Sequence, residues 1–433
     1  MIFAWTTARN ATSSGLALAY IFSITIIHWF GGTAMLIPGW HPTAPDIVHA
    51  GFILATFGCI AFVAGTFIGG KLGRNVSVDM SQDVRSPYYI GRAYVTIGLL
   101  SNFLLPGITK GVPTMQAVLA SGWYLTAVGL SILCHVTWTA HEYRSFLKWL
   151  AVAFVLPLAT IIAFGFIGSG VALLIIVLAV ISRTVRPRWK VVVFGLLIGY
   201  LGISTFTSYI DHRMEIRRSV WGNQPLTSRI STLYRVAARP EWFDPTNSRH
   251  LQFLDDRLNQ NRLVGHSVAW IGAGAVTYAQ GDTFSDAALA LIPRVIWPDK
   301  HFVAGGSALV STYTGLSFAR GTSVGIGQTM EFFINFGVVG VGVGFFLIGI
   351  FLGGLDVVAG LKLHQGDWLG FAKYLLPGIA FLQVEGSLVE IAASAGSALL
   401  TVTMINFWLA KSNTRRLVSG SRSPRFAKTF SST

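Results

Sequence analysis

Charged residues are scarce in this sequence. Asp, Glu, Lys and Arg together make up 12% of its 433 residues, whereas typical soluble domains hold about 25%. Hydrophobic residues supply 52%, and several apolar runs reach the roughly 20 residues that a helix needs to cross a bilayer. The scarcity of charge argues against a soluble protein, and the composition predicts an all-α, polytopic integral membrane protein.

Cysteine and metal-binding patterns are also scarce. Cys59 and Cys134 both fall in apolar runs, so neither a disulfide nor thiolate chemistry is indicated. The sequence has no Walker motif and no aspartate-rich pair of the kind that holds Mg²⁺ with a nucleotide sugar. GVVGVGVG (337–344) resembles a dinucleotide fingerprint, but it lies inside an apolar run without a preceding strand, and close packing of helices explains it better. We therefore expect no cofactor and no metal.

The apolar runs predict about ten transmembrane helices. Their expected ranges are 15–37, 47–69, 88–106, 114–138, 148–165, 167–184, 191–209, 326–354, 373–391 and 395–411. Two pairs of short helices must turn tightly, one around GFIGSG (165–170) and one around AASAGS (392–397). The predicted organisation is a membrane region (1–209), a long segment (210–325), a second membrane region (326–411) and a basic tail (412–433).

The positive charge predicts the orientation of the chain. A net charge of +14 in a soluble protein would suggest nucleic acid. Here Lys and Arg gather beside the connections after the second, fourth, sixth and eighth spans and in the tail, and such residues are held on the cytoplasmic side. We therefore expect no nucleic-acid partner. Both termini are predicted to be cytoplasmic, and the long segment 210–325 is predicted to face outward.

The long segment 210–325 is expected to form helices and to carry a binding surface. Its apolar spacing predicts a helix over 227–238 and another, capped by Asn247 or Ser248, that runs through Arg262. A Gly/Ser-rich stretch (303–327) has the composition of a mobile lid. Because this is the only long stretch outside the apolar runs, and because it is rich in arginine and tryptophan, we expect it to be the functional face.

Arginines are the first candidates for chemistry. A diphosphate at a membrane surface needs several cationic donors, and arginine binds phosphate through two parallel hydrogen bonds. The candidates for binding diphosphate or glycan are Arg217, Arg218, Arg257, Arg262, Lys300 and Arg320, and Arg294 is the candidate for direct catalysis. The alternative is that these cations reach lipid headgroups or pair with Asp255, Asp256 and Glu241.

Carboxylates and histidines are the second candidates. Charges in spans are costly and tend to be functional, and Glu331 lies near the predicted outer end of a span with Asn335 one turn later on the same face. Glu385 and Glu390 are expected in the outer half of the span 373–391. His266 is the second candidate for a general base. The alternatives are a structural salt bridge from Glu331 to an arginine of 210–325 and a structural histidine.

Three neighbouring stretches carry a resemblance. ALIPRVIWPDK (290–300), the Gly-rich stretch after it and MEFFINFGVVG (330–340) resemble the O-antigen polymerase family, the oligosaccharide repeat-unit polymerases, and the similarity extends over roughly residues 80–410. The resemblance implies a metal-independent glycosyltransferase of GT-C-like fold in the bacterial inner membrane. It would transfer a glycan from undecaprenyl diphosphate to a new lipid-linked repeat unit on the periplasmic side, among membrane lipid and beside a chain-length regulator protein.

Two other functions stay open at this point. O-antigen ligases share the donor and use arginines and a histidine in a similar outer loop, for which Arg257, Arg262, Arg294 and His266 are the nearest equivalents here. A flippase or transporter for the same lipid-linked sugar would need paired charges through the middle of the membrane and internal repeats, and neither is visible in the sequence. We therefore expect Glu331 or His266 to deprotonate an acceptor hydroxyl while arginines stabilise the departing lipid diphosphate.

Overall fold

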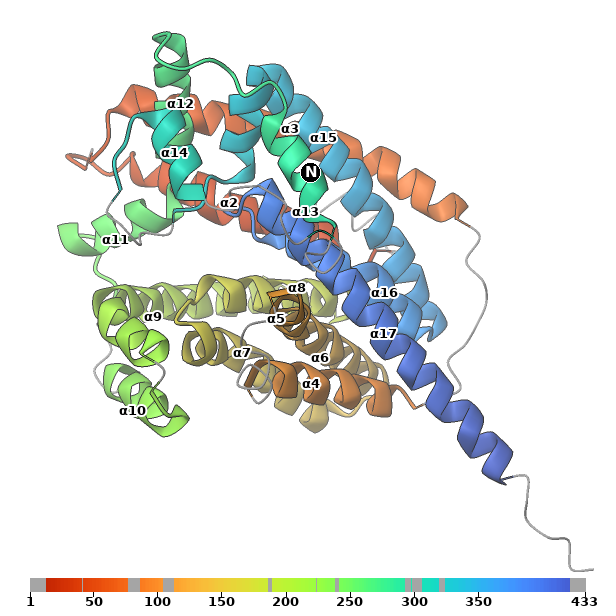
Figure 1. The fold of residues 1–433 in the computed structure, drawn as a ribbon. Coiled ribbons are helices and arrows are strands. Elements are labelled where there is room, and N and C mark those ends of the chain that lie inside the picture. Colours follow the sequence, from red (N-terminus) through yellow and green to blue (C-terminus); the bar gives the residue numbers. More distant parts are fainter. Residues whose placement is uncertain are drawn as a thin grey trace, which may run out of the picture.

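The structure is a computed structural model of the whole chain. Its described residues are 13–40, 42–76, 86–103, 113–185, 189–222, 224–237, 241–292, 297, 306–318 and 324–420. Within these ranges all regular structure is helical (Figure 1). The fold class is thus the all-α class that the apolar runs predict.

The helices follow one another along the chain with short connections. In order they are α2 (Leu16–Ala34), α3 (Pro45–Asn75), α4 (Pro87–Phe103), α5 (Pro113–Ala120), α6 (Gly122–Thr139), α7 (Tyr143–Phe164), α8 (Gly168–Val185), α9 (Trp189–Trp221), α10 (Leu226–Ala237), α11 (Ser248–Leu258), α12 (Asn261–Gly272), α13 (Asp282–Ala290), α14 (Gly306–Thr314), α15 (Gln328–Gln365), α16 (Trp368–Ile379), the 3₁₀ turn η1 (Ala380–Leu382) and α17 (Leu388–Gly420).

Seven stretches of helix within the described residues are long and apolar enough to cross a membrane. They belong to α2, α3, α6 with the last residues of α5, α7, α8, α15 and α17. This confirms a helical, membrane-embedded protein. The other three predicted spans coincide with α4, α9 and α16, so the count of ten stays a prediction.

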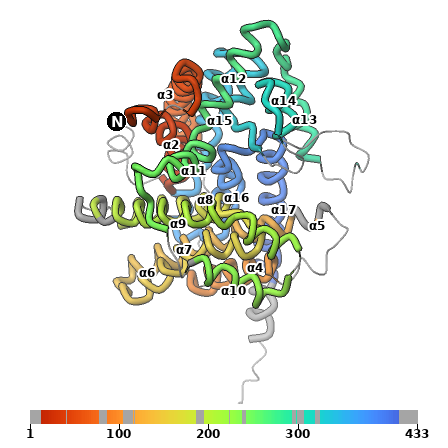
Figure 2. The backbone as a smooth tube through the Cα atoms, turned by 90° about the vertical axis from the view of Figure 1, so that its left-hand side faces the viewer, coloured from red at the N-terminus to blue at the C-terminus, as the bar shows by residue number. Residues whose placement is uncertain are grey.

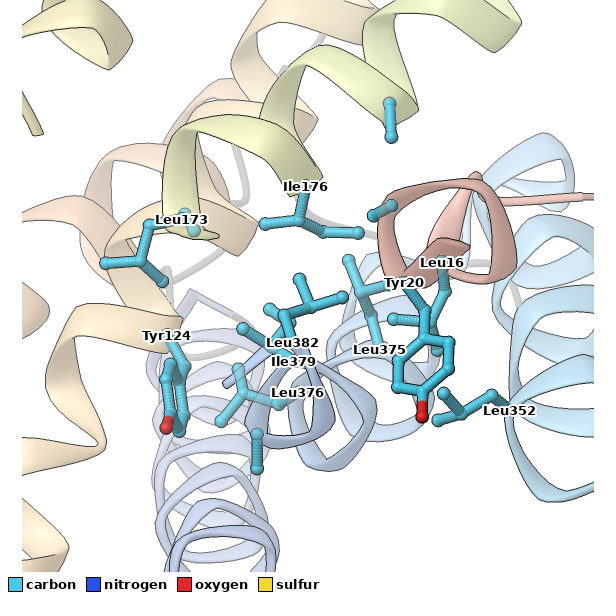
Figure 3. Close-up of a cluster of buried hydrophobic side chains, with 14 of the residues drawn as sticks. Leu16, Tyr20, Tyr124, Leu173, Ile176, Leu352, Leu375, Leu376, Ile379 and Leu382 are labelled. Carbon is cyan, nitrogen blue, oxygen red and sulfur yellow. The ribbon is translucent and has the colours of Figure 1, made fainter. Parts of the chain in front are cut away.

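The core of the bundle is centred on α16 and η1. Figure 3 shows Leu376 and Ile379 in the middle, with Tyr124 of α6 on one side and Tyr20 of α2 and Leu352 of α15 on the other. Leu376 and Ile379 are fully buried. In a bilayer the lipid tails are as apolar as these side chains, so tight van der Waals packing holds the helices together.

Glycines bring α3 and α15 into close contact. A Cβ atom on Gly69 would lie 2.0 Å from the backbone oxygen of Ile350, so no larger residue fits there without a shift of the backbone. Gly342, within the stretch 337–344, lies against the ring of Phe57 on α3. Close packing against another helix therefore explains Gly342, as the sequence interpretation holds, whereas Gly337 lies at a break in α15 and Gly340 and Gly344 pack against Phe332 of the same helix.

Most helices of the segment 210–325 lie along one side of the bundle. In Figure 1, α10 and α11 lie at the left and α12 and α14 at the upper left, whereas α13 lies near the middle and the C-terminal end of α17 points to the lower right. Figure 2 views the left-hand side and shows α16 and α17 near the middle, with α12 and α14 above them and α10 below. Helix α13 packs against α17 and so connects this segment to it.

Within the segment 210–325, one predicted helix is confirmed and another is corrected. Helix α10 matches the expected 227–238, and the side chain of Asn247 accepts a hydrogen bond from the Arg249 amide, so this residue caps α11. The expected continuous helix through Arg262 is wrong, because α11 ends at Leu258 and α12 begins at Asn261. The Gly/Ser-rich stretch holds α14, which packs against α12.

The two predicted tight turns have different outcomes. Gly165 adopts a φ of 77° and ends α7, so the turn at GFIGSG is confirmed. The turn at AASAGS is wrong, because the chain turns at 383–387 and residues 392–397 lie inside α17. Ser387 and Glu390 start α17 early by a reciprocal capping box, in which the Ser387 amide donates to Glu390 Oε2 (3.0 Å) and the Glu390 amide donates to Ser387 Oγ (3.3 Å).

Candidate functional site

Glu331 is the most unusual charged residue in the described part of the chain. It lies in the first turn of α15 and its side chain has no solvent exposure. Oε2 accepts a hydrogen bond from the Leu388 amide (2.7 Å) at the start of α17. The buried Oε1 forms no hydrogen bond of normal geometry among the described residues, although the Thr283 hydroxyl interacts with the carboxylate. No ion pair to Glu331 is found there either, so the salt bridge weighed as an alternative is not seen. A carboxylate oxygen held out of water without a well-formed hydrogen bond is costly, and it marks a functional site.

A buried polar network holds the start of α15 in place. Gln328 accepts a hydrogen bond from the Tyr20 hydroxyl (2.5 Å), and Thr329 contacts Nε2 of His28 (3.1 Å). His28 in turn contacts Asn261 at the start of α12 through Nδ1 (2.7 Å). The network joins α2, α12 and α15 directly beside Glu331. The sequence interpretation missed it, although a tyrosine and a histidine inside the first apolar run were a visible signal.

Asn335 fastens α13 to the segment that carries Glu331. Its Nδ2 donates to the Glu331 carbonyl (2.7 Å) and to the Thr283 hydroxyl (2.8 Å), and its Oδ1 accepts from the Gly281 amide (2.9 Å). Immediately after it the helix breaks at Phe336 and Gly337, which leave helical geometry. The eight residues 328–335 therefore form a short unit that is held from three sides.

Two further carboxylates lie close to Glu331, and a third lies near one of them. Glu390 and Asp286 are near enough to interact with Glu331 electrostatically, and Glu385 interacts with Glu390. Glu385 is exposed in the turn 383–387, and its Oε1 lies 3.3 Å from where a Cβ on Gly168 would be. The expected placement of Glu390 in the preceding span is wrong, because its side chain caps the first turn of α17. Glu390 thus has a structural function that its position in an apolar run concealed.

An apolar groove of about 380 Å³ begins beside Glu331. It lies between α13, α15 and α17, and Phe284, Phe332, Phe336, Leu388 and Ile391 line it together with further apolar side chains and glycines. Leu388 therefore contributes both to the wall of the groove and to the hydrogen bond that holds the Glu331 carboxylate. The groove suits a hydrocarbon chain that ends at this carboxylate.

A second cavity, of about 200 Å³, lies on another face of α17. Its wall comes from the ends of α5, α6, α7 and α8, from the turn after η1 and from α17. The side chains with polar atoms along it belong to Ser121, Trp123, Tyr124, Ser169, Gln383, Ser394 and Ser397, and the rest of the wall, with Ala120, Phe164, Leu173 and Ala393, is apolar. The turn 383–387 and Leu388 therefore connect a cavity of mixed polarity to an apolar groove.

Arg217 is held in an aromatic setting beside the turn between α7 and α8. Its guanidinium lies 4.5 Å from the ring centroid of Phe166 and 5.1 Å from that of Trp221, and its Nε contacts the Gly165 carbonyl (3.5 Å). No described carboxylate lies within ion-pairing distance of it. In the turn between α7 and α8, the Arg217 side chain therefore lies beside Gly165 and the Glu385 side chain lies beside Gly168. An unpaired arginine with its plane fixed by aromatic rings is suited to bind phosphate.

The other predicted site residues are placed more loosely. Arg218 is exposed, and Arg257 is half-buried in the last turn of α11. Arg262 pairs with Asp256 (3.3 Å), as the alternative interpretation of the arginines expects. Burial, and then the charge of Arg262, lowers the pKa of His266 below its usual value, which favours the neutral imidazole. No hydrogen bond or ion pair joins these residues to Glu331 within the described ranges.

Three predicted residues cannot be placed in the site. Arg294, Lys300 and Arg320 lie outside the described residues. The described ranges also hold no group of three His, Cys, Asp or Glu side chains that is arranged to bind a metal.

No protein-family model, curated protein or solved structure matches this chain. A function for the chain therefore follows from the site's own chemistry, which offers a held carboxylate, an apolar groove beside it and a cavity of mixed polarity.

Proposed function

We propose that this protein is a membrane glycosyltransferase that polymerises undecaprenyl-diphosphate-linked oligosaccharide repeat units at the outer face of the bacterial inner membrane. The observation that carries the proposal is Glu331, which holds one carboxylate oxygen by an amide hydrogen bond and leaves the other without a hydrogen bond of normal geometry beside an apolar groove. A substrate with a hydrocarbon tail, a charged linkage and a sugar matches the apolar groove, the arginines and the hydroxyl-bearing cavity.

In the proposed reaction, Glu331 is the general base. It takes the proton of an acceptor hydroxyl as the hydroxyl oxygen forms a bond to the anomeric carbon of the donor glycan. The bond between that carbon and the phosphate oxygen breaks, and its electron pair leaves with the lipid diphosphate. The products are the extended glycan on the acceptor lipid, the free lipid diphosphate and a protonated Glu331. The Leu388 amide keeps the carboxylate oriented throughout.

The apolar groove is the proposed seat of the donor's isoprenoid chain. Along α15 its wall takes residues from both sides of the break, from Phe332 before it to Ile348 after it. The rings of Phe332 and Phe345 lie 5.4 Å apart, so the two parts of α15 pack against one another along the groove. The described lining residues are all apolar or glycine, so a chain in this groove would make the same contacts as in lipid.

Arginines are the proposed binding groups for the diphosphate. Arg217 supports this best. No described carboxylate pairs with its guanidinium, which lies over the rings of Phe166 and Trp221. Charge on the departing phosphate would be stabilised where it develops. Arg218, Arg257, Arg262, Arg294, Lys300 and Arg320 remain candidates for further contacts to diphosphate or glycan, and Arg294 and His266 remain candidates for direct catalysis.

The experiment that tests this function uses the purified full-length protein and synthetic undecaprenyl-diphosphate repeat units. We expect a ladder of lipid-linked products that differ by one repeat unit, formed also in the presence of excess EDTA. A wild-type protein that forms no ladder but joins preformed polymer to a lipid A-core acceptor would be a ligase. One that only moves the lipid-linked unit across a vesicle membrane would be a flippase. Either outcome refutes the polymerase proposal.

A further inference from the structure

The cavity of about 200 Å³ between α6, α8 and α17 has the chemistry of a carbohydrate site. Drug-sized ligands occupy pockets of roughly 300–1,000 Å³, so this cavity suits a smaller unit. Serine hydroxyls both donate and accept hydrogen bonds, as sugar hydroxyls do. Four of them, Ser121, Ser169, Ser394 and Ser397, lie along its wall.

An unsatisfied donor points independently to a ligand. Trp123 lines the cavity and is 3% exposed, but its indole N–H has no hydrogen-bond partner among the described residues. Its ring is braced edge to face by Phe103 (5.6 Å) and Phe164 (6.1 Å). A buried indole N–H usually finds an acceptor. A sugar hydroxyl would supply that acceptor.

The remaining polar groups of the cavity are already ordered. Gln383 Nε2 donates to the Tyr124 hydroxyl (2.9 Å), which also interacts with Ser394. Ser121 and Ser397 share a hydrogen bond of 2.9 Å. These pairs keep the hydroxyls of α6 and α17 facing one another across the cavity. Such preorganisation lowers the entropic cost of binding a polar ligand.

The position of the cavity connects it to Glu331. Ser121 and Trp123 lie at the start of α6 and Ser169 lies at the start of α8, so the cavity opens among helix ends rather than at mid-membrane. Gln383 lines it, and five residues later Leu388 holds the Glu331 carboxylate. One short turn thus spans the distance between cavity and base.

We propose that this cavity binds a single pyranose unit of the acceptor glycan, with the Trp123 indole N–H donating to a sugar hydroxyl and the serines of α6 and α17 binding the remaining hydroxyls. This inference rests on the proposed glycosyltransferase function and adds to it the place of the acceptor. The donor's lipid chain and the acceptor's sugar would then occupy different faces of α17.

Direct binding to the full-length protein in detergent tests this inference apart from turnover. The probes are methyl glycosides of glucose, galactose, mannose, rhamnose and N-acetylglucosamine, observed by saturation-transfer difference NMR. We expect at least one glycoside to bind the wild type. Ser394→Leu fills the cavity and should weaken that binding by about tenfold or more. Trp123→Phe removes only the N–H and should weaken it roughly two- to tenfold, as for one lost neutral hydrogen bond.

A matched variant on the other face of α17 separates the outcomes. Ala392→Trp fills the apolar groove and should leave glycoside binding unchanged. Binding that survives both Ser394→Leu and Trp123→Phe, or a wild type that polymerises but binds none of the glycosides, overturns the inference. Cavity-dependent binding by a protein without polymerase activity upholds the sugar site and removes the proposed function. The melting temperature of each variant shows whether it is folded.

Discussion

The two hollows beside α17 differ in the hydrogen-bonding groups that they offer. One, between α13, α15 and α17, has a wall of apolar side chains and glycine, whereas the other adds serine, tyrosine, glutamine and tryptophan to apolar side chains. Both approach the turn 383–387 and Leu388, and the carboxylate of Glu331 is held there. In the proposed reaction the two faces of α17 would bind the two halves of an amphipathic substrate separately, and Glu331 would act near the turn that both hollows approach.

The largest expected effect comes from Glu331, which the Leu388 amide holds beside the groove. Glu331→Gln keeps an oxygen to accept from the Leu388 amide but removes the base. Turnover should fall by roughly 10²- to 10⁴-fold, the usual loss for a general base, with donor binding and melting temperature close to the wild type. Product ladders under single-turnover conditions measure the loss. A folded Glu331→Gln protein that polymerises at the normal rate would move the base to His266.

The next-largest expected effect is on the proposed binding of the donor diphosphate by Arg217. Arg217→Lys retains the charge but loses the planar group that lies over Phe166 and Trp221. We expect kcat/KM to fall about ten- to hundredfold, which corresponds to the roughly 1.5–3 kcal/mol of a hydrogen bond to a charged group. The exposed neighbour Arg218→Lys is the matched control and should change kcat/KM less. Equal effects at both positions would indicate general attraction to anionic lipid instead.

A smaller effect should distinguish the apolar groove from the cavity of mixed polarity. Ala392→Trp puts an indole into the groove, and we expect the KM for the lipid-linked donor to rise about tenfold, as for the loss of one or two buried CH₂ contacts at roughly 0.8 kcal/mol each. Turnover at saturating donor should change little. Leu400→Trp is the control, since Leu400 is 46% exposed on the same helix. A donor KM unchanged by Ala392→Trp would exclude the groove as the lipid site.

The smallest effect concerns a carboxylate that serves the fold. Glu390→Ala removes the capping box at the start of α17 and should lower the free energy of unfolding by about 0.5–2 kcal/mol. Glu390→Gln preserves the cap, because glutamine also accepts from the Ser387 amide. Thermal melts of the two variants in detergent measure the difference. A loss of activity in Glu390→Gln as large as that of Glu331→Gln would show that the two carboxylates act together.

The sequence predicted the membrane fold well, because the signal for it is strong and local. Most expected spans coincide with a helix, and the glycine at position 165 marks a turn that the structure contains, but the span expected over 373–391 is broken by the turn 383–387. The second turn was misplaced, because AASAGS contains small residues that are equally at home in a close-packed helix. The capping pair Ser387 and Glu390 was the better signal for the start of α17.

The site was predictable only for its single most unusual residue. Glu331 stood out because a carboxylate in an apolar run is costly, and the structure finds it buried and held by a backbone amide. No spacing in the sequence could predict that the Leu388 amide, 57 residues later, donates to Glu331. Nor could it predict that His28, in the first apolar run, contacts the nearby Thr329. The serines of the cavity of mixed polarity were invisible for the same reason, since they come from three separate helices.

The break in α15 affects how the protein fits bilayers of different thickness. Gly337 has a φ of 62°, so the helix breaks after Asn335 and a second helical stretch begins at residue 338. The helix continues over 338–365, and its apolar part, 338–355, is about 27 Å long, close to the roughly 30 Å of a hydrocarbon core, so a modest tilt adjusts the thickness that it spans. Because the short unit above the break is fastened to α2, α13 and α17, the tilt can follow the membrane while the carboxylate keeps its depth. Hydrophobic mismatch is thereby absorbed by the part of the helix that carries no chemistry.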